Sequence, residues 1–266
     1  MRPPSRTRFH PWARRVTELD PLAIHEVSSE RELKFKIPDA ESFQRLLQTA
    51  AGEKEPPSTV QRNHIFDTPE RDLFRSGYRL RLREEDGRWL LTAKGPKIRD
   101  DSSSESKIEH AHPEVESLLS AEAARTLVEG IGSPLEALAK AAGLDGADRA
   151  WAVALAKRFE QAPIGHLGMF QNERFRVPWQ ILNPSTGESI HCTLELDRTR
   201  FPGGRLDHEL EVEVPAGVEA GILEHEIRRW LEDAGVMPEP SSGKAKRFFK
   251  ALDEQALRAE TVDRFS

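Results

Sequence analysis

Charged and apolar residues alternate in the segment 30–37. At the two-residue period of a β-strand, Glu30, Glu32 and Lys34 fall on one face, whereas Leu33 and Phe35 fall on the other. Carboxylates and an ammonium at this spacing can bind ions, but one such row is also typical of a strand face in water. The rest of the sequence decides between these interpretations.

The same alternation recurs, so that seven segments of the chain have one charged and one apolar face. The cationic positions of these rows are Lys34, Arg79, Arg81, Arg83, Lys94, Lys107, Arg174 and Arg176. The acidic positions suited to a metal are Glu30, Glu32, Glu195, Asp197, Glu209 and Glu211. Rows of like charge repel one another, and an exposed sheet face built for stability alone would mix the signs.

Helical segments between and after the strands indicate which face is covered. Residues 38–50, with Asp39 as the expected N-cap, and 218–236 are amphipathic and need apolar surface to pack on. If the helices cover the apolar strand faces, the charged faces point inward. We therefore predict an α+β fold, a closed eight-stranded antiparallel β-barrel with a charged interior and helices packed outside.

The residue types predict the ligand of this interior. Arginine offers paired donors to phosphate oxygens and lysine a point charge. Carboxylates without histidine or cysteine partners favour Mg²⁺ or Mn²⁺ over zinc. Both signs in one lumen indicate a metal–phosphate complex and phosphoryl transfer, in which a second metal ion could lower the pKa of the attacking water.

Composition limits the alternatives. The 266 residues contain 39 Lys and Arg against 45 Asp and Glu, a net charge of −6, which gives no case for nucleic-acid or membrane partners. The single cysteine, Cys192, excludes an intrachain disulfide and favours a reducing compartment, so we expect the cytoplasm. We interpret residues 1–25 as a basic tail and the chain as one domain over 26–253, with a helical insertion at 113–168 and a helix end and tail at 254–266.

The segment "ERELK" resembles the ExExK signature of the CYTH superfamily, the triphosphate tunnel metalloenzymes. The resemblance continues in order through "NHIFDTP", "YRLRLREEDGRWLLTAKGP", "LELDRTRF", "LDHELEVEV" and "SSGKAKRFF", over residues 28–250. It implies an eight-stranded antiparallel tunnel and, as activities, inorganic or thiamine triphosphatase, class IV adenylate cyclase or RNA triphosphatase.

The resemblance also implies roles for single residues. Glu30 and Glu32, with Glu209 and Glu211, would hold the metal, and the catalytic set is Glu30, Glu32, Lys34 and Asp197. Triphosphate would be bound by Lys34, Arg79, Arg81, Lys94, Arg174 and Arg176, whereas Lys244 and Arg247 would close one tunnel end. Lys107 stands where the family commonly has arginine.

Several points stay open in the sequence. The Asp86-Gly87 pair predicts a hairpin turn. Arg83 is interpreted equally well as a phosphate ligand or as an exposed residue near this hairpin. Glu195 and Asp197 are interpreted as metal ligands or as partners of the lumen cations. His110 and His112 are expected on the face opposite Glu109, in a structural role. We predict hydrolysis of inorganic tripolyphosphate, with thiamine triphosphatase, adenylate cyclase or a non-catalytic polyphosphate- or nucleotide-binding module as alternatives; monomer and homodimer both stay open.

Overall fold

The computed structural model describes residues 29–52, 56–97, 109–184 and 186–265. The basic tail predicted for residues 1–25 and Lys107 lie outside this part of the chain. The strands are β1 (Ser29–Ile37), β2 (Ser58–Asp67), β3 (Arg79–Glu85), β4 (Arg88–Lys94), β5 (Glu109–Leu119), β6 (Gly165–Leu182), β7 (Ser189–Arg200), β8 (Leu206–Glu213) and β9 (Glu239–Pro240). The helices are α2 (Ala40–Ala51), α3 (Asp72–Arg75), α4 (Ala121–Val128), α5 (Pro134–Ala139), α6 (Gly146–Arg158), the 3₁₀ turn η2 (Pro202–Gly204), α7 (Ala220–Asp233) and α8 (Lys244–Phe265).

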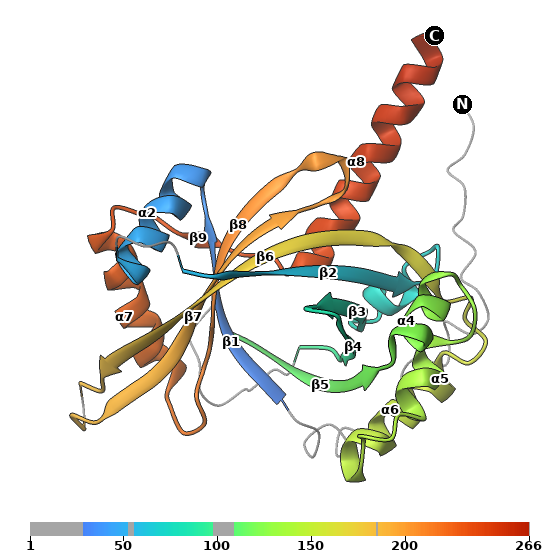
Figure 1. The fold of residues 1–266 in the computed structure, drawn as a ribbon, viewed down its shortest axis with the longest axis horizontal. Helices are drawn as coiled ribbons and strands as arrows, with labels where there is room; N and C mark the ends of the chain where they lie inside the picture. Colours follow the sequence, from blue (N-terminus) through green and yellow to red (C-terminus); the bar gives the residue numbers. More distant parts are fainter. Residues whose placement is uncertain (1–28, 53–55, 98–108, 185, 266) are drawn as a thin grey trace, which may run out of the picture.

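The strands form one antiparallel sheet that curls strongly around its concave face (Figure 1). Their order is β5-β4-β3-β2-β6-β7-β8-β1-β9, and β1 also pairs with β5, from Ser29 opposite Pro113 to Leu33 opposite Glu109. The antiparallel sheet with helices outside it confirms the predicted α+β class.

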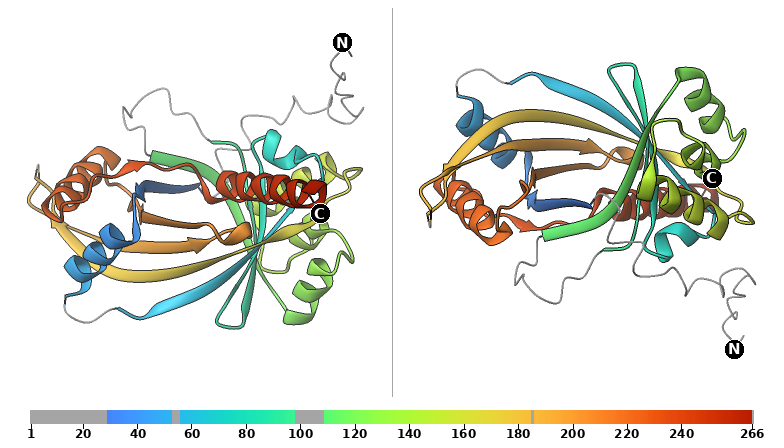
Figure 2. Two further views of the ribbon diagram at one scale, coloured as in Figure 1. Left: turned by 90° about the horizontal axis from the view of Figure 1, so that it is seen from above. Right: turned by 90° about the horizontal axis from the view of Figure 1, so that it is seen from below.

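Apolar strand faces point outward and are covered by helices at two ends of the sheet. Leu33 and Phe35 of β1 join the apolar residues of β6, β7 and β8 in a core that α2 and α7 cover. Leu80 and Leu82 of β3 join a second core under α4, α5 and α6. Figure 2 shows these two groups of helices at opposite ends of the molecule. The charged faces therefore point to the concave side, as predicted.

Local signals position the first helix and the hairpin. Asp39 precedes α2, and its side chain accepts a hydrogen bond of 2.7 Å from the backbone N–H of Ser42, which confirms the predicted N-cap. Asp86 and Gly87 connect β3 to β4 with positive φ angles of 50° and 75°, values that suit the tight turn of a β-hairpin. This turn fixes the register that places Arg79 opposite Lys94.

The concave face is not charged throughout. Ile65 of β2 and Phe170 of β6 lie near one end of it and pack against Phe248 and Phe249 of α8. Helix α8 therefore stays on the sheet through apolar contacts, and its first residue, Lys244, lies at the concave face.

The helical insertion is shorter than predicted. The sequence reading assigned residues 113–168 to helices, but β5 continues to Leu119 and β6 begins at Gly165. Glu114, Val115 and Glu116 alternate at the period of a strand, with Val115 buried in the core under the helices. The pairing with β4 uses this alternation, so the surrounding sheet decides against the helix propensity of the segment. Among the described helices, none is both long and apolar enough to cross a membrane.

The leucines of β3 give a direct test of this packing. Leu82 is fully buried between two arginines in the chain, whereas the side chain of Leu182 at the end of β6 is 64% exposed. Leu82→Ala should lower the free energy of unfolding by about 2 to 5 kcal/mol through the cavity it leaves. Leu182→Ala should change it by less than about 0.5 kcal/mol, and urea unfolding curves of equal slope measure both. Equal effects would contradict the assignment of strand faces.

Two histidines on the outer face predict a pH dependence of stability. His64 Nδ1 of β2 lies 3.1 Å from His166 Nε2 of β6. Burial, and next the repulsion by His166, lower the pKa of His64 from 6.5 to about 4. The unfolded chain then binds more protons between these values, so this stabilisation is complete above pH 6.5 and is lost as the pH falls toward 4.

His64→Gln should therefore lose less stability over this pH range than the wild-type protein does. His191→Gln, at an exposed position of β7, serves as the control and should follow the wild-type curve. Urea unfolding at a series of pH values measures both variants. If the free energy of unfolding changes equally with pH in His64→Gln and in the wild type, the His64–His166 pair does not cause the pH dependence.

Candidate active site in the concave face

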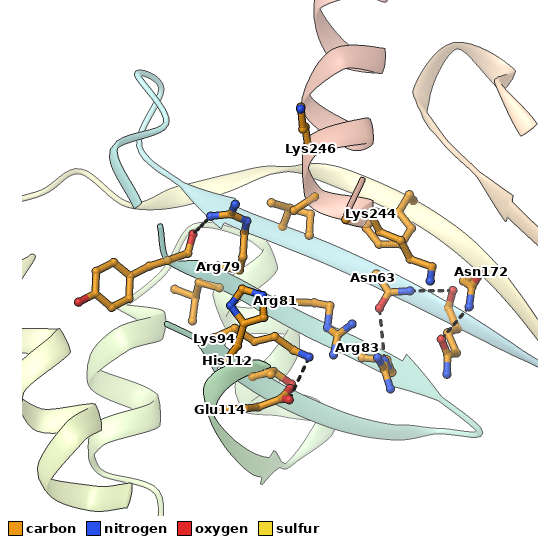
Figure 3. A pocket seen from close by; sticks show the side chains of 18 of the residues that line it. Asn63, Arg79, Arg81, Arg83, Lys94, His112, Glu114, Asn172, Lys244 and Lys246 are labelled. Atoms are coloured by element: carbon orange, nitrogen blue, oxygen red, sulfur yellow. Dashed lines mark hydrogen bonds and ion pairs between the residues drawn. The ribbon is translucent and has the colours of Figure 1, made fainter. Parts of the chain in front are cut away.

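A cavity of about 510 Å³ lies on the concave face of the sheet. Strands β1 to β6 and β8 contribute its walls, and the start of α8, from Ser242 to Lys246, borders it. Most of its polar lining comes from charged side chains, which Figure 3 shows in part. The cavity therefore lies where the sequence predicted a charged interior.

Three arginines of β3 form one wall of the cavity (Figure 3). Arg79, Arg81 and Arg83 share a face because they alternate with buried Leu80 and Leu82. Among the described residues, no carboxylate forms an ion pair with any of these three arginines. This wall, called the arginine wall below, keeps its positive charge available.

Neutral groups hold two of these guanidinium groups in place. Arg79 donates to the backbone carbonyls of Tyr78 at 2.6 Å and Phe74 at 3.2 Å, and it lies 4.1 Å above the Phe74 ring. Arg83 donates to the Asn63 amide oxygen at 3.3 Å. Burial, followed by repulsion from Arg81, lowers the pKa of Arg83 to about 10. Arg83 thus faces the cavity and does not lie on the exposed surface near the hairpin.

Arg81 differs from its neighbours in the row. Its Nε atom is buried and has no hydrogen-bond partner among the described residues. A buried guanidinium donor without a partner costs free energy, and an anion in the cavity would relieve that cost. Of the four arginines with such an Nε atom among the described residues, Arg81 is the one that borders the cavity.

Uncharged polar side chains also line the cavity, among them Gln61, Asn63 and Asn172, and these were not predicted from the sequence. Asn172 donates to the Gln61 side-chain oxygen at 3.1 Å and accepts from the Thr199 hydroxyl at 2.7 Å. Gln61 in turn donates to Glu85 at 2.8 Å, and all three amide or hydroxyl side chains are buried. The sequence does place Gln61, Asn63 and Ile65 on one face of β2. Because this face carries no charge, the charge pattern does not identify it as part of the cavity.

Three carboxylates form a buried cluster on the neighbouring strands β7 and β8. Asp197, Glu209 and Glu211 each offer an oxygen, and these oxygens lie within 4.8 Å of one another. The register explains the cluster, because Asp197 lies opposite Glu209 and Glu195 opposite Glu211. Oxygen donors alone, this close together, fit Mg²⁺ or Mn²⁺. We call these three residues the carboxylate cluster.

Buried cations neutralise the carboxylate cluster. Arg174 donates to both oxygens of Asp197 at 2.8 and 2.7 Å and to Glu211 at 2.6 Å. The Lys244 ammonium lies 2.8, 2.7 and 2.6 Å from Asp197, Glu209 and Glu211. Lys34 lies 2.8 Å from both Glu32 and Glu211.

These ion pairs control ionisation. Burial raises the pKa of Asp197 and of Glu211, but Arg174 and Lys244 outweigh it, so that both pKa values lie below their usual range. Burial lowers the pKa of Lys34, whereas Glu211 and Glu32 raise it well above its ordinary value. Asp197 and Glu211 therefore stay ionised at neutral pH in spite of their burial.

The structure brings most of the predicted residues to the cavity. Its lining includes Glu32, Lys34, Arg79, Arg81, Arg83, Lys94, Arg174, Glu211 and Lys244. Asp197 and Glu209 lie directly behind, in the carboxylate cluster. The backbone of Glu30 belongs to β1, but its side chain lies outside the described part of the chain.

Other predicted residues lie elsewhere. Arg176, with a side chain 40% exposed, pairs with Glu195 at 3.1 Å and Glu85 at 3.0 Å, away from the cavity wall. Glu195 is thus a partner of cations rather than a member of the carboxylate cluster. Arg247 is buried and donates to Glu209 at 2.7 Å, which anchors α8 on β8. None of the three borders the cavity.

Strand β5 presents the other face from the one predicted. His112, expected to point away from the lumen, borders the cavity together with Glu114 and Glu116. Glu114 pairs with Lys94 at 2.9 Å, and Glu116 accepts a hydrogen bond of 2.7 Å from Thr92. The buried side chain of Val115 sets this parity, because a shift of one residue would move every side chain of the strand to the opposite face.

Comparisons with known proteins were made for the whole chain. A family model described as the CYTH domain matches residues 28–239. No curated protein matches the sequence significantly.

Two solved structures share the fold. HpAC1 from Hippeastrum, a candidate adenylyl cyclase with a dominant triphosphatase activity, is 22% identical, with a TM-score of 0.64 over 83% of this chain and 95% of its own. A candidate adenylate cyclase from Bacillus halodurans is also 22% identical, with a TM-score of 0.55 over 83% of this chain and 98% of its own. The family match covers most of the chain, and the chain therefore belongs to the CYTH family.

Proposed function

We propose that this protein hydrolyses the terminal phosphate of a triphosphate, with inorganic tripolyphosphate as the first substrate to test. The observation that carries the proposal is the division of one cavity into two halves. The arginine wall has no carboxylate partners among the described residues, whereas the carboxylate cluster offers buried oxygen atoms that a divalent cation could bind in place of Lys244. A triphosphate with a divalent metal complements both halves.

Different residues of the cavity would then bind the phosphates and the metal ion. Arg79, Arg81 and Arg83 bind and orient phosphate oxygens, and Lys94 adds a further charge at the same wall. Asp197, Glu209 and Glu211, with Glu32 beside them, would hold Mg²⁺ or Mn²⁺. The metal ion would neutralise negative charge on the phosphate that is transferred to water.

We further propose that the curled sheet works as a closed tunnel. Strand β1 pairs with β8 through Glu32–Ile37 and with β5 through Ser29–Leu33, which joins the two sides of the sheet. A closed wall excludes bulk water and strengthens charge interactions with the substrate.

Other functions of the family are distinguished by substrate. HpAC1 shares only the fold at this level of identity, so its reported activities define the comparison to be made. Rates with tripolyphosphate, thiamine triphosphate and ATP, with cyclic AMP measured in parallel, rank the candidates. Cyclic AMP as the main product would overturn the proposal. If the protein binds these substrates but hydrolyses none of the three with Mg²⁺ or Mn²⁺, a non-catalytic binding module would be favoured.

Arg81 provides a test of the arginine wall. Arg81→Met should raise the KM for tripolyphosphate by about tenfold to a hundredfold, the value of a charged hydrogen bond. Stability should not fall, because the change removes a charge that repels Arg83. Arg88→Met, at the exposed tip of the same hairpin, is the matched control. Unchanged kinetics in Arg81→Met would argue against phosphate binding at this wall.

Glu211 provides a test of the carboxylate cluster. Glu211→Gln should lower phosphate release by about a hundredfold or more, because the amide is a poorer ligand for Mg²⁺ or Mn²⁺. Glu213→Gln, an exposed position two residues further along β8, should retain the wild-type rate. Chelation should abolish the activity, and added Mg²⁺ or Mn²⁺ should restore it. Full activity in Glu211→Gln or in the presence of chelator would refute metal dependence.

A further inference from the structure

Lys244 occupies the centre of the carboxylate cluster. It is the first residue of α8, and its ammonium contacts all three members of the cluster within 2.8 Å. Burial lowers its pKa, but Asp197, Glu209 and Glu211 outweigh this and raise it, so Lys244 stays charged. The lysine is therefore an internal cation at the position that suits a divalent ion.

The ammonium and a metal ion cannot share this position. A small divalent cation binds carboxylate oxygens at about 2.0 to 2.2 Å and would take the same oxygens that Lys244 now contacts. Two cations this close would also repel one another strongly in a buried site. Metal binding thus requires Lys244 to leave.

The carboxylate cluster has cation partners besides Lys244. Each carboxylate keeps a second partner after Lys244 departs: Asp197 keeps Arg174, Glu209 keeps Arg247, and Glu211 keeps Lys34 and Arg174. Arg174 and Lys34 belong to central strands, and Arg247 is buried against β8. The carboxylates would therefore stay in place while Lys244 moves.

The cavity beside Lys244 offers space into which its side chain can move. It borders the cavity, as do Ser242 and Gly243 before it, and its side chain points from the start of α8 toward the cavity in Figure 3. A Cβ atom at Gly243 would meet nothing within 4 Å, so there is open space beside the backbone at the residue before Lys244. The long flexible stem of lysine allows the ammonium to reach new partners by rotation alone.

We propose that Lys244 acts as an exchangeable counter-ion, which neutralises the carboxylate cluster in the metal-free protein and moves to the phosphates when the metal binds. Metal and triphosphate then favour the same position of Lys244, so each increases the affinity for the other. The transfer to phosphate rests on the proposed function, whereas the competition with metal does not.

The competition is tested by metal binding without any substrate. Mn²⁺ titration followed by electron paramagnetic resonance, at mildly alkaline pH where the carboxylates stay ionised, gives the Kd of the whole protein. Lys244→Met should bind Mn²⁺ about tenfold more tightly than the wild type, because no lysine has to be displaced. Lys250→Met is the matched control, since Lys250 lies exposed on the same helix and pairs with Glu254 at 3.7 Å, outside the carboxylate cluster.

A measurement on the wild-type protein tests the same competition even if Lys244→Met does not fold. Adding Mg²⁺ to protein labelled at lysine side chains should shift the nuclear magnetic resonance signal of Lys244 and leave that of Lys250 in place. Equal or weaker Mn²⁺ binding by folded Lys244→Met, or a Lys244 signal that Mg²⁺ does not move, would overturn the competition.

Phosphate binding forms the second stage of the test. Tripolyphosphate should tighten Mn²⁺ binding in the wild type more than in Lys244→Met, measured before turnover. If Lys244→Met binds Mn²⁺ more tightly but neither protein releases phosphate, the triphosphatase proposal fails while the competition stands. If phosphate is released but Mn²⁺ affinity is unchanged in the variant, the counter-ion proposal fails alone.

Discussion

The structure depends on the burial of carboxylates beneath its cavity. Asp197 and Glu209 are fully buried, and an isolated carboxylate in such a place would lose its charge or destabilise the fold. Four cations prevent this, from strands β1 and β6 and from the start of α8: Lys34, Arg174, Lys244 and Arg247. The acidic half of the site can therefore form only if these strands and α8 come together.

This requirement explains why α8 is bound in two ways. Phe248 and Phe249 pack on the apolar end of the concave face, and Arg247 and Lys244 pair with the carboxylates beside it. The apolar contacts supply free energy without direction, whereas the ion pairs fix the register of the helix. One helix thus completes both the packing and the charge balance of the site.

The two halves of the cavity differ in how their buried charges are stabilised. Carboxylates on β7 and β8 are compensated within the protein, and their geometry is set before any ligand binds. The guanidinium groups of β3 are held by carbonyl and amide oxygens, which orient them without cancelling their charge. Under the proposed function, an anion would therefore meet an oriented positive surface, and a metal would meet an oriented set of oxygens.

The sequence by itself determined the strand faces wherever charge alternated with large apolar residues. Leu33 and Phe35 opposite Glu32 and Lys34, and the leucines between the arginines of β3, identified the inner rows because an apolar face must be covered. The resemblance to the CYTH family rests on segments of the same rows, and the family model matches residues 28–239. The sheet class, the N-cap at Asp39 and the hairpin at Asp86 were predictable from local chemistry.

Only the tertiary structure decided which charges remain available. Arg174 and Arg81 look alike in the sequence, but one is neutralised by three carboxylates and the other has no such partner among the described residues. The face of β5 that carries His112 was set by the packing of Val115, and the place of Lys244 by the docking of a helix distant in the chain. These outcomes depend on pairings between remote segments, and alternation within one strand carries no information about its partners.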